Sequence, residues 1–164
     1  MNYCMQCGTK LEMRFHETEG REIPYCSSCG AYRHPVFNTA VSMIVTDSSR
    51  ERILLIQQYG KPDYILVAGY VNCGEDAEDA VVREVREEVG LRVTDVRYNH
   101  SRYFPRTNTL MLNFTATVGD EDVKSNEEVD AWRWFTPEEA KENIRPNSLA
   151  RAFLLGYLGG HYEW

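Results

Sequence analysis

Long hydrophobic runs are missing from this sequence of 164 residues, in which no stretch approaches 18 consecutive apolar residues. A membrane-spanning helix needs about 20 such residues, so the sequence predicts no membrane anchor. The region where a secretory signal would need a basic start and an apolar run already carries Cys4 and Cys7. We therefore expect a soluble protein of the cytoplasm with no membrane partner.

Positive charge is also in short supply. Lysine and arginine together number 18, against 25 aspartates and glutamates, which gives a formal net charge of −7. Unspecific binding to nucleic-acid backbones depends on basic side chains that neutralise phosphates, so this balance argues against such binding. The end of a nucleic acid can still be a substrate. The four histidines are scattered along the chain, and we assign none of them a role.

Cysteine is sparse, but four of the five cysteines form two C-x-x-C pairs, with 18 residues between the pairs. This spacing is typical of a four-thiolate zinc site, and the glycine after each pair permits the tight turn that such a site needs. Four thiolates complete a tetrahedron, so the zinc would be structural and would stabilise a ribbon too small to fold alone, residues 1–35. Two disulfides are the alternative, which a reducing cytoplasm disfavours. The expected zinc ligands are Cys4, Cys7, Cys26 and Cys29.

The most informative segment is residues 69–91, which match every fixed position of the pattern G-x5-E-x7-R-E-U-x-E-E-x-G-U, where U is a bulky aliphatic residue. From Ala77 to Val89 the segment contains no glycine or proline and many good helix formers. Gly90 follows at the point where a left-handed residue would end a helix. The sequence therefore predicts one helix that carries most of the acids of the pattern.

Three glutamates of this helix, Glu84, Glu87 and Glu88, fall within an arc of roughly 100°. Arg83 lies one turn before Glu87, where it can pair with that carboxylate and hold its rotamer. Between positions 75 and 88 there are seven acids and only two arginines. Such a cluster repels a diphosphate unless hard cations lie between them, and carboxylate ligands suit Mg²⁺ or Mn²⁺. A solvated acidic helix is the alternative, which the flanking glycines and the spacing disfavour.

The remaining sequence predicts a core of strands with further helices. The 43% of hydrophobic residues suffices for one compact domain beside the ribbon. Periodicity alone indicates an α/β or α+β protein. Capping residues and prolines mark two later helices, one that begins at Pro137 and one that runs from Ser148 to about Tyr157. We expect strands at residues 37–46, 53–58, 65–67, 97–104, 110–118 and 132–135.

The glycine and glutamate pattern resembles that of the Nudix hydrolases, which use divalent metal ions to cleave a diphosphate that links a nucleoside to another group. The resemblance implies the α/β/α sandwich of that family, with a mixed sheet, over residues 36–164. A zinc ribbon directly before such a domain is similar to the NADH pyrophosphatases, some of which also remove NAD caps from RNA. Residues 101–109 keep about half of a second signature of that branch, SQPWPFPxS. The branch further implies a homodimer.

The resemblance also implies roles for individual residues. Arg83 and the three helix glutamates correspond to the catalytic centre, and Glu87 or Glu88 takes the proton of the attacking water. Tyr70 stands where relatives stack an aromatic side chain on a base, although a packing role is the alternative. The implied metal ligands are Glu84, Glu87, Glu88, Glu128 and the carbonyl of Ala68, and the implied substrate contacts are Tyr70, Ser101, Arg102, Arg106 and Ala150.

The expected reaction is hydrolysis of NAD(H) to nicotinamide mononucleotide and AMP, with NAD-capped RNA as a further substrate. One alternative is a pyrophosphatase of the same class that acts on ADP-ribose or on another dinucleotide or nucleotide sugar. A second alternative, from a different class, is an inactive module that senses nucleotides or binds RNA. The intact pattern and the net charge of −7 weigh against that second alternative.

Overall fold

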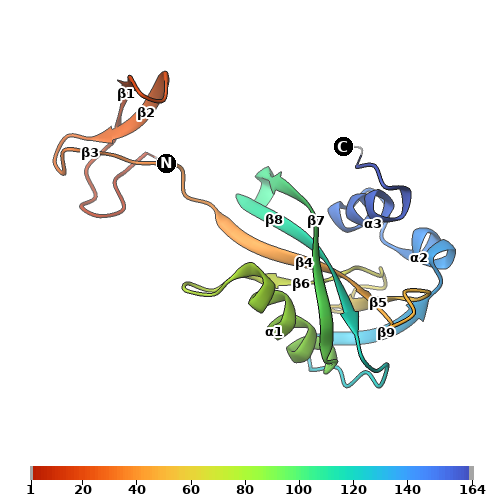
Figure 1. Ribbon diagram of the computed structural model, residues 1–164. Coiled ribbons are helices and arrows are strands. Elements are labelled where there is room, and N and C mark those ends of the chain that lie inside the picture. Colours follow the sequence, from red (N-terminus) through yellow and green to blue (C-terminus); the bar gives the residue numbers. More distant parts are fainter. Residues whose placement is uncertain (1, 163–164) are drawn as a thin grey trace. The chain divides into compact units, whose positions relative to one another are not determined.

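The computed structural model describes residues 2–162 of the chain. The chain forms two compact units, Met1–Phe37 and Asn38–Trp164, and each is described here by itself (Figure 1). The division falls where the cysteine-rich segment ends and the first long hydrophobic strand begins.

The first unit is a small antiparallel sheet with almost no apolar core. Among its described residues only Cys4, Ile23 and Cys26 are buried hydrophobic side chains, whereas Met13 and Phe15 are more than half exposed. So little buried apolar surface cannot offset the loss of chain entropy by itself. The strands, in the order in which they pair, are β1 (Glu12–His16), β2 (Arg21–Cys26) and β3 (Ala31–Tyr32).

The second unit contains a six-stranded sheet. Neighbouring strands follow the order β7-β8-β4-β5-β9, and β6 pairs with β4. The pair β4 and β8 is parallel and the other pairs are antiparallel, so the predicted mixed sheet is confirmed. The strands are β4 (Asn38–Thr46), β5 (Ile53–Gln58), β6 (Val67–Tyr70), β7 (Val93–Phe104), β8 (Thr109–Val118) and β9 (Val129–Phe135).

Helices cover both faces of this sheet, as Figure 1 shows. Because side chains alternate along a strand, Val45 of β4 packs in one cluster with Val81 and Val85, whereas its neighbour Ile44 packs in another with Phe153. The predicted α/β/α sandwich is therefore confirmed. The helices are α1 (Ala77–Val89), α2 (Pro137–Asn143) and α3 (Leu149–Gly159).

The ends of the helices follow the local signals of the sequence. Gly90 ends α1 with a φ of 70°, in the left-handed region that glycine adopts easily. Thr136 and Glu139 form a capping box at the start of α2. The Ser148 side chain accepts a hydrogen bond from the backbone N–H of Arg151 at the start of α3.

Strand boundaries differ from the predicted ones where contacts between strands override local pattern. The strand expected at 65–67 instead begins at Val67 and runs to Tyr70, while Ile65 forms only an isolated bridge with Ile56. Strand β7 begins at Val93, because pairing with β8 extends across the polar residues that interrupt the apolar pattern there. These shifts bring Tyr70 into the strand that carries the start of the glycine and glutamate pattern.

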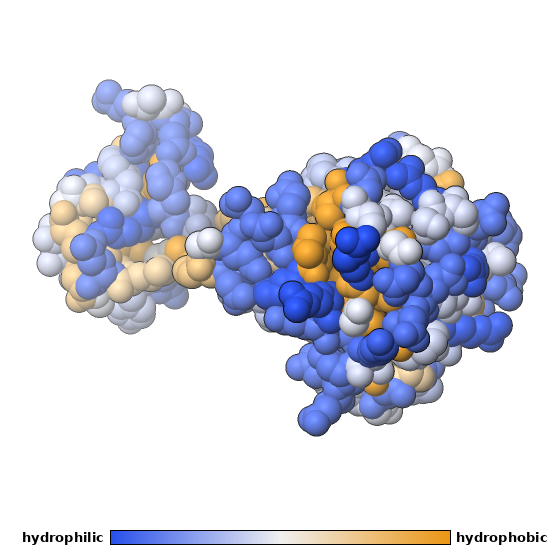
Figure 2. Space-filling model, turned by 60° about the horizontal axis from the view of Figure 1, so that its bottom comes forward, coloured by the Kyte–Doolittle hydropathy of each residue, from blue (hydrophilic) through white to orange (hydrophobic). Residues whose placement is uncertain are grey.

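The face of the molecule that Figure 2 shows is mostly hydrophilic, with smaller hydrophobic patches between the hydrophilic residues. Every helix within residues 2–162 is too short or too polar to cross a membrane.

Candidate active site

The cysteines of the first unit form a compact cluster of sulfur atoms. The four Sγ atoms all lie within 4.8 Å of one another, with 4.0 Å between Cys4 and Cys29 and 3.5 Å between Cys7 and Cys26. All four are free thiols, so the alternative of two disulfides does not hold in this structure. Zinc bonds of about 2.3 Å place the corners of a tetrahedron about 3.8 Å apart. The cluster therefore fits a zinc ion.

Arg33 supports this cluster from outside. Its Nε donates to Cys4 Sγ at 3.2 Å and its Nη2 donates to Gln6 Oε1 at 2.9 Å. The hydrogen bond from Arg33 is the main cause that lowers the pKa of Cys4 to about 6. A thiolate is the form that binds metal, so Arg33 favours the ligand state of Cys4.

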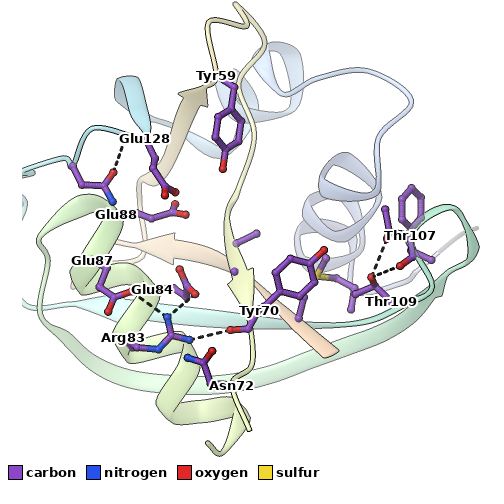
Figure 3. Close-up of a pocket in the computed structure, with 16 residues that line it drawn as sticks. Tyr59, Tyr70, Asn72, Arg83, Glu84, Glu87, Glu88, Thr107, Thr109 and Glu128 are labelled. Carbon is purple, nitrogen blue, oxygen red and sulfur yellow. Dashed lines mark hydrogen bonds and ion pairs between the residues drawn. The ribbon is translucent and has the colours of Figure 1, made fainter. Parts of the chain in front are cut away.

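The second unit has a pocket of about 570 Å³ beside α1 (Figure 3). It is lined by β6, by the acidic face of α1, by the loop before β9, and by the ends of β7 and β8 around the short 3₁₀ helix η1 (Pro105–Thr107). Three carboxylates, of Glu84, Glu88 and Glu128, reach the same side of this pocket, as Figure 3 shows.

Glu84 lies directly against the backbone of β6, where glycine is required. A Cβ atom built on Gly69 would stand 1.9 Å from Glu84 Cδ and 2.0 Å from Glu84 Oε1. Contacts of this kind are shorter than any real Cβ contact, so a side chain at position 69 would displace the carboxylate. Gly69, the first glycine of the sequence pattern, therefore leaves the space that the Glu84 carboxylate occupies.

Arg83 is fully engaged in holding its neighbours in place. Its guanidinium donates to Glu75 at 2.6 Å, to Glu84 at 2.7 Å and to Glu87 at 3.1 Å. It also donates to the carbonyl of Tyr70 at 2.9 Å. The hydrogen bonds from Arg83 are the main cause that lowers the pKa of Glu75 to about 2. The predicted pairing with Glu87 is present, and Arg83 has no donor left over for a phosphate.

Glu88 is the most unusual carboxylate of the pocket. It is only 4% exposed, and within residues 2–162 its Oε2 has no hydrogen-bond partner. Burial, followed by repulsion from Glu84 and Glu128, raises the pKa of Glu88 to about 7, although the amide of Gln58 acts in the opposite direction. A buried carboxylate without a partner is unfavourable unless a cation binds it.

The loop that carries Glu128 is fastened to the end of α1. The backbone N–H of Asn126 donates to the carbonyl of Glu88 at 3.0 Å, and the N–H of Lys124 donates to the carbonyl of Val89 at 2.9 Å. The Asn126 side chain in turn accepts from the N–H of Glu128 at 3.0 Å. These contacts bring a glutamate from 40 positions later in the chain next to Glu88.

The carbonyl of Ala68 also faces the pocket. The N–H of Val71 donates to the carbonyl of Thr39 at 2.9 Å. In an antiparallel pair every second residue forms hydrogen bonds with the partner strand, so residues 69 and 67 are the next ones on β6 to bond to β4. Ala68 and Tyr70 alternate with them and direct their carbonyls away from β4. The bond from Arg83 to the Tyr70 carbonyl agrees with this direction.

These oxygen atoms form a donor set that suits hard divalent cations. Carboxylates and a backbone carbonyl are the ligands that Mg²⁺ and Mn²⁺ prefer. The pocket carboxylates border open space. The unpartnered Oε2 of Glu88 and the close packing of the Glu84 carboxylate on Gly69 are both consistent with a site that binds cations.

Two tyrosines stand at the pocket on different elements. Tyr70 of β6 is 57% exposed and Tyr59, which follows β5, is 70% exposed. Partial desolvation of the Tyr59 hydroxyl, followed by the charges of Glu128, Glu88 and Glu84, raises the pKa of Tyr59. An exposed ring at Tyr70 is available for stacking on a base, as the resemblance implied.

The structure brings most of the predicted site residues together. Those that line the pocket are Ala68, Tyr70, Arg83, Glu84, Glu87, Glu88 and Glu128.

The other predicted substrate contacts lie outside this pocket. Ser101 and Arg102 lie on β7, Arg106 lies on η1, and Ala150 of α3 packs against the hydrophobic cluster on the far face of the sheet. Their roles stay predictions.

Several pocket residues have no signal in the sequence. Tyr59 and Asn126 line the pocket from two separate loops, and neither belongs to a recognisable pattern. Glu75 was expected only as one acid among seven, but it makes the shortest hydrogen bond to Arg83. Its fixed place in the glycine and glutamate pattern was the one signal that could have indicated this role.

Comparison with known proteins decides the family. A family model described as NUDIX domain matches residues 36–153, which is more than half of the chain. The chain belongs to the NUDIX domain family. The predicted membership among the Nudix hydrolases is thereby confirmed.

Curated relatives of this Nudix chain carry the name NAD-capped RNA hydrolase NudC. The protein of Pseudomonas aeruginosa is 31% identical over 157 residues, which cover 95% of this chain and 55% of the relative. The protein of Deinococcus radiodurans is 36% identical over 139 residues, which cover 82% of this chain and 48% of the relative. These matches support the predicted likeness to the NADH pyrophosphatase branch. The chain spans about half the length of the curated relatives it matches.

A solved structure shares the Nudix fold. The crystal structure of a NUDIX hydrolase from Nitrosomonas europaea aligns with a TM-score of 0.63 at 21% identity, over 100% of this chain and 96% of that chain. At this identity the likeness shows the fold alone.

Proposed function

We propose that this chain hydrolyses the diphosphate linkage of a nucleoside diphosphate derivative, with NAD(H) as substrate and nicotinamide mononucleotide and AMP as products. The buried carboxylate of Glu88 carries this proposal. Its unpartnered oxygen lies in a pocket with Glu84 and Glu128, where three negative charges are tolerable only if cations bind them. Relatives named NAD-capped RNA hydrolase NudC support a substrate that contains NAD, including NAD-capped RNA.

Two kinds of metal site follow from the donor sets. Glu84, Glu88, Glu128 and the carbonyl of Ala68 would hold Mg²⁺ or Mn²⁺, with Glu87 at the rim, and the four cysteines of the ribbon over residues 1–35 would hold a structural zinc ion. The chemistry supplied by the divalent cations is neutralisation of the diphosphate charge and a lower pKa of the attacking water.

The side chains of the pocket have separate tasks in this reaction. Arg83 keeps the rotamers of Glu84 and Glu87 fixed, because it bonds to both at once. Tyr70 offers an exposed ring on which a base of the substrate can stack. Glu87 and Glu88 are the two carboxylates that can accept the proton of the attacking water. A Gln variant that keeps cation binding but loses turnover identifies which of them does so.

A hydrolysis panel tests the proposal. The chain is incubated with Mg²⁺ or Mn²⁺ and with NADH, NAD, ADP-ribose, Ap4A or NAD-capped RNA, and the products are separated. Nicotinamide mononucleotide and AMP from NADH support the proposal, whereas ribose phosphate and AMP from ADP-ribose alone favour the alternative substrate class. Nucleotide binding without any metal-dependent turnover would refute hydrolysis and favour an inactive sensing module.

The catalytic role of Glu88 has a matched control on the same helix. Glu88→Gln should lower turnover by several orders of magnitude, because the change removes a charged ligand of the divalent cations and a carboxylate that can accept the proton of the attacking water. Glu78→Gln removes an exposed carboxylate from the first turn of α1 and should leave turnover unchanged. The homodimer and the cytoplasmic location stay predictions, and light scattering of the purified chain checks the first.

A further inference from the structure

Tyr59 at the pocket rim is not explained by packing. Its side chain is 70% exposed, and it belongs to neither of the two hydrophobic clusters of the second unit. Its hydroxyl makes no hydrogen bond to any residue within 2–162. A large aromatic side chain in this position contributes little to the stability of the fold.

The backbone of Tyr59 is strained. Its φ is 59°, in the left-handed region that bulky residues rarely adopt, and the next residue, Gly60, has a φ of 65°. The turn is held by a hydrogen bond from the N–H of Gly60 to Asp130 Oδ2 at 2.6 Å and by one from the N–H of Lys61 to the carbonyl of Gln58 at 3.2 Å. Strain that the surrounding contacts maintain, with no gain in packing, is a mark of functional positions.

The strained turn directs the side chain toward the carboxylates. Figure 3 shows the hydroxyl of Tyr59 pointing into the pocket, toward the space between Glu128 and Glu88 on one side and Tyr70 on the other. The pocket is therefore bordered by a tyrosine from each of two elements, with the acidic cluster beside them.

The charges of the pocket limit how the chain itself can contact a diphosphate. Arg83 is the only cationic side chain among the described pocket residues, and it already bonds to three carboxylates and a carbonyl. Within the lining of this pocket, the side chains that can donate directly to phosphate oxygens are therefore neutral ones. The phenolic O–H of Tyr59 is such a donor, and it remains protonated at neutral pH.

We propose that the Tyr59 hydroxyl donates a hydrogen bond to a diphosphate oxygen of the substrate and so fixes the diphosphate against the acidic cluster. This inference rests on the proposed function and adds a substrate-binding residue to it. The contact is to the diphosphate and not to a base, so it serves every substrate that contains this linkage.

The test compares Tyr59→Phe, which removes only the hydroxyl, with the wild-type chain on NADH and on ADP-ribose in Mg²⁺. A lost hydrogen bond to a charged oxygen should lower kcat/KM roughly 10- to 100-fold, by the same factor for both substrates. Tyr98→Phe is the matched control, because Tyr98 is an exposed tyrosine that lies on β7 outside the pocket. It should keep the wild-type kcat/KM.

A second variant separates function from folding. Tyr59→Gly places glycine at a left-handed φ, so it should raise the unfolding midpoint while it lowers kcat/KM at least as much as Tyr59→Phe does. A residue with a purely structural role would instead lose stability.

The outcomes distinguish the inference from the proposed function. A wild-type chain that hydrolyses no diphosphate overturns both. An active wild-type chain with a Tyr59→Phe variant within twofold of it on both substrates overturns this inference alone. Loss on NADH only, seen in Tyr59→Ala but not in Tyr59→Phe, would show that the ring contacts a base and would equally overturn it.

Discussion

The two candidate metal sites of this chain are built in opposite ways. The sulfur atoms of the first unit lie within 4.8 Å of one another and can enclose a single ion, whereas the carboxylates of the second unit line an open pocket of about 570 Å³. The first unit has three buried hydrophobic residues among those described, while the second has a core on both faces of its sheet.

The difference distinguishes a site whose metal would stabilise a fold from a site whose metal would take part in a reaction. The ribbon has so little apolar burial that it would need a bound zinc ion to stay folded. The second unit has a core on both faces of its sheet, and this core holds Glu88 buried beside the like charges of Glu84 and Glu128. In a closed site the free energy of metal binding stabilises the fold, whereas an open site keeps coordination positions for a substrate.

Removal of zinc should show this contrast most strongly. Structural zinc sites contribute about 10 to 16 kcal/mol of apparent binding energy. Cys26→Ala removes a buried ligand and should unfold the segment Met1–Phe37 while the second unit keeps its own transition. Hydrogen exchange, read separately for the two units, measures this. Cys73→Ser is the control, because Cys73 lies outside the cluster. Protected ribbon amides in Cys26→Ala would contradict the account.

The acidic site should respond to pH in a way that the ribbon does not. The pKa of Glu88 in the folded chain, about 7, lies above its ordinary value of 4.5, so between these values the folded state holds a proton that the unfolded state has lost. In the absence of divalent cations, stability should therefore fall as the pH rises from 4.5 to 7. Glu88→Gln lacks this titration and should be more stable than the wild type above pH 7, by on the order of 3 kcal/mol, and similar to it below pH 4.5.

Urea unfolding followed by tryptophan fluorescence measures this effect. All three tryptophans come after residue 37, so the signal reports on the second unit. The exposed Glu78→Gln should follow the wild-type curve at every pH. Stability curves of the wild type and Glu88→Gln that run parallel from pH 4 to pH 8 would show that Glu88 is not a strained charge.

The packing of the Glu84 carboxylate against Gly69 tests the geometry of the acidic site, whereas the pH experiment tests its charge. Gly69→Ala adds a Cβ where the Glu84 carboxylate now lies, so the carboxylate must move. A displacement of about 1 Å at a reacting centre costs on the order of a hundredfold in turnover, and we expect a loss of that size in kcat. Gly159→Ala adds a Cβ that meets nothing within 4 Å, so this variant should keep the wild-type kcat. Wild-type kcat in Gly69→Ala would mean that Glu84 need not hold its position.

The smallest expected effect concerns the support of the zinc cluster. Arg33→Ala removes the hydrogen bond to Cys4 Sγ, and loss of such an outer contact lowers metal affinity by roughly tenfold or more. Competition with a chromogenic chelator measures the zinc affinity. Arg21→Ala, which removes an exposed arginine paired with Glu19, serves as the control. Equal zinc affinities of the wild type and Arg33→Ala would remove Arg33 from the site.

The features that could be predicted from the sequence are those determined by the spacing of residues within one short segment. The cysteine pairs and the helix over Ala77–Val89 each depend on spacing within a short segment, and both were placed correctly. Gly69 was recognised only as a fixed position, because its reason is the approach of Glu84 from the next element.

Contacts between distant segments explain what could not be predicted. Asn126 reaches Glu88 through its backbone, and Tyr59 enters the pocket because a turn is held by Asp130, 70 positions away from Gly60. No pattern in one segment reports such a contact. The same holds for Arg33, which lies 29 positions from the cysteine that it supports.

The most direct test of the central claim is a Mn²⁺ titration of the zinc-loaded chain, followed by electron paramagnetic resonance of the free ion. The account predicts saturable binding by the wild type, binding about 100-fold weaker or absent in Glu88→Gln, and unchanged binding in Glu78→Gln. If the wild type shows no saturable binding, or if Glu88→Gln binds Mn²⁺ as tightly as the wild type, the carboxylate pocket is not a divalent cation site.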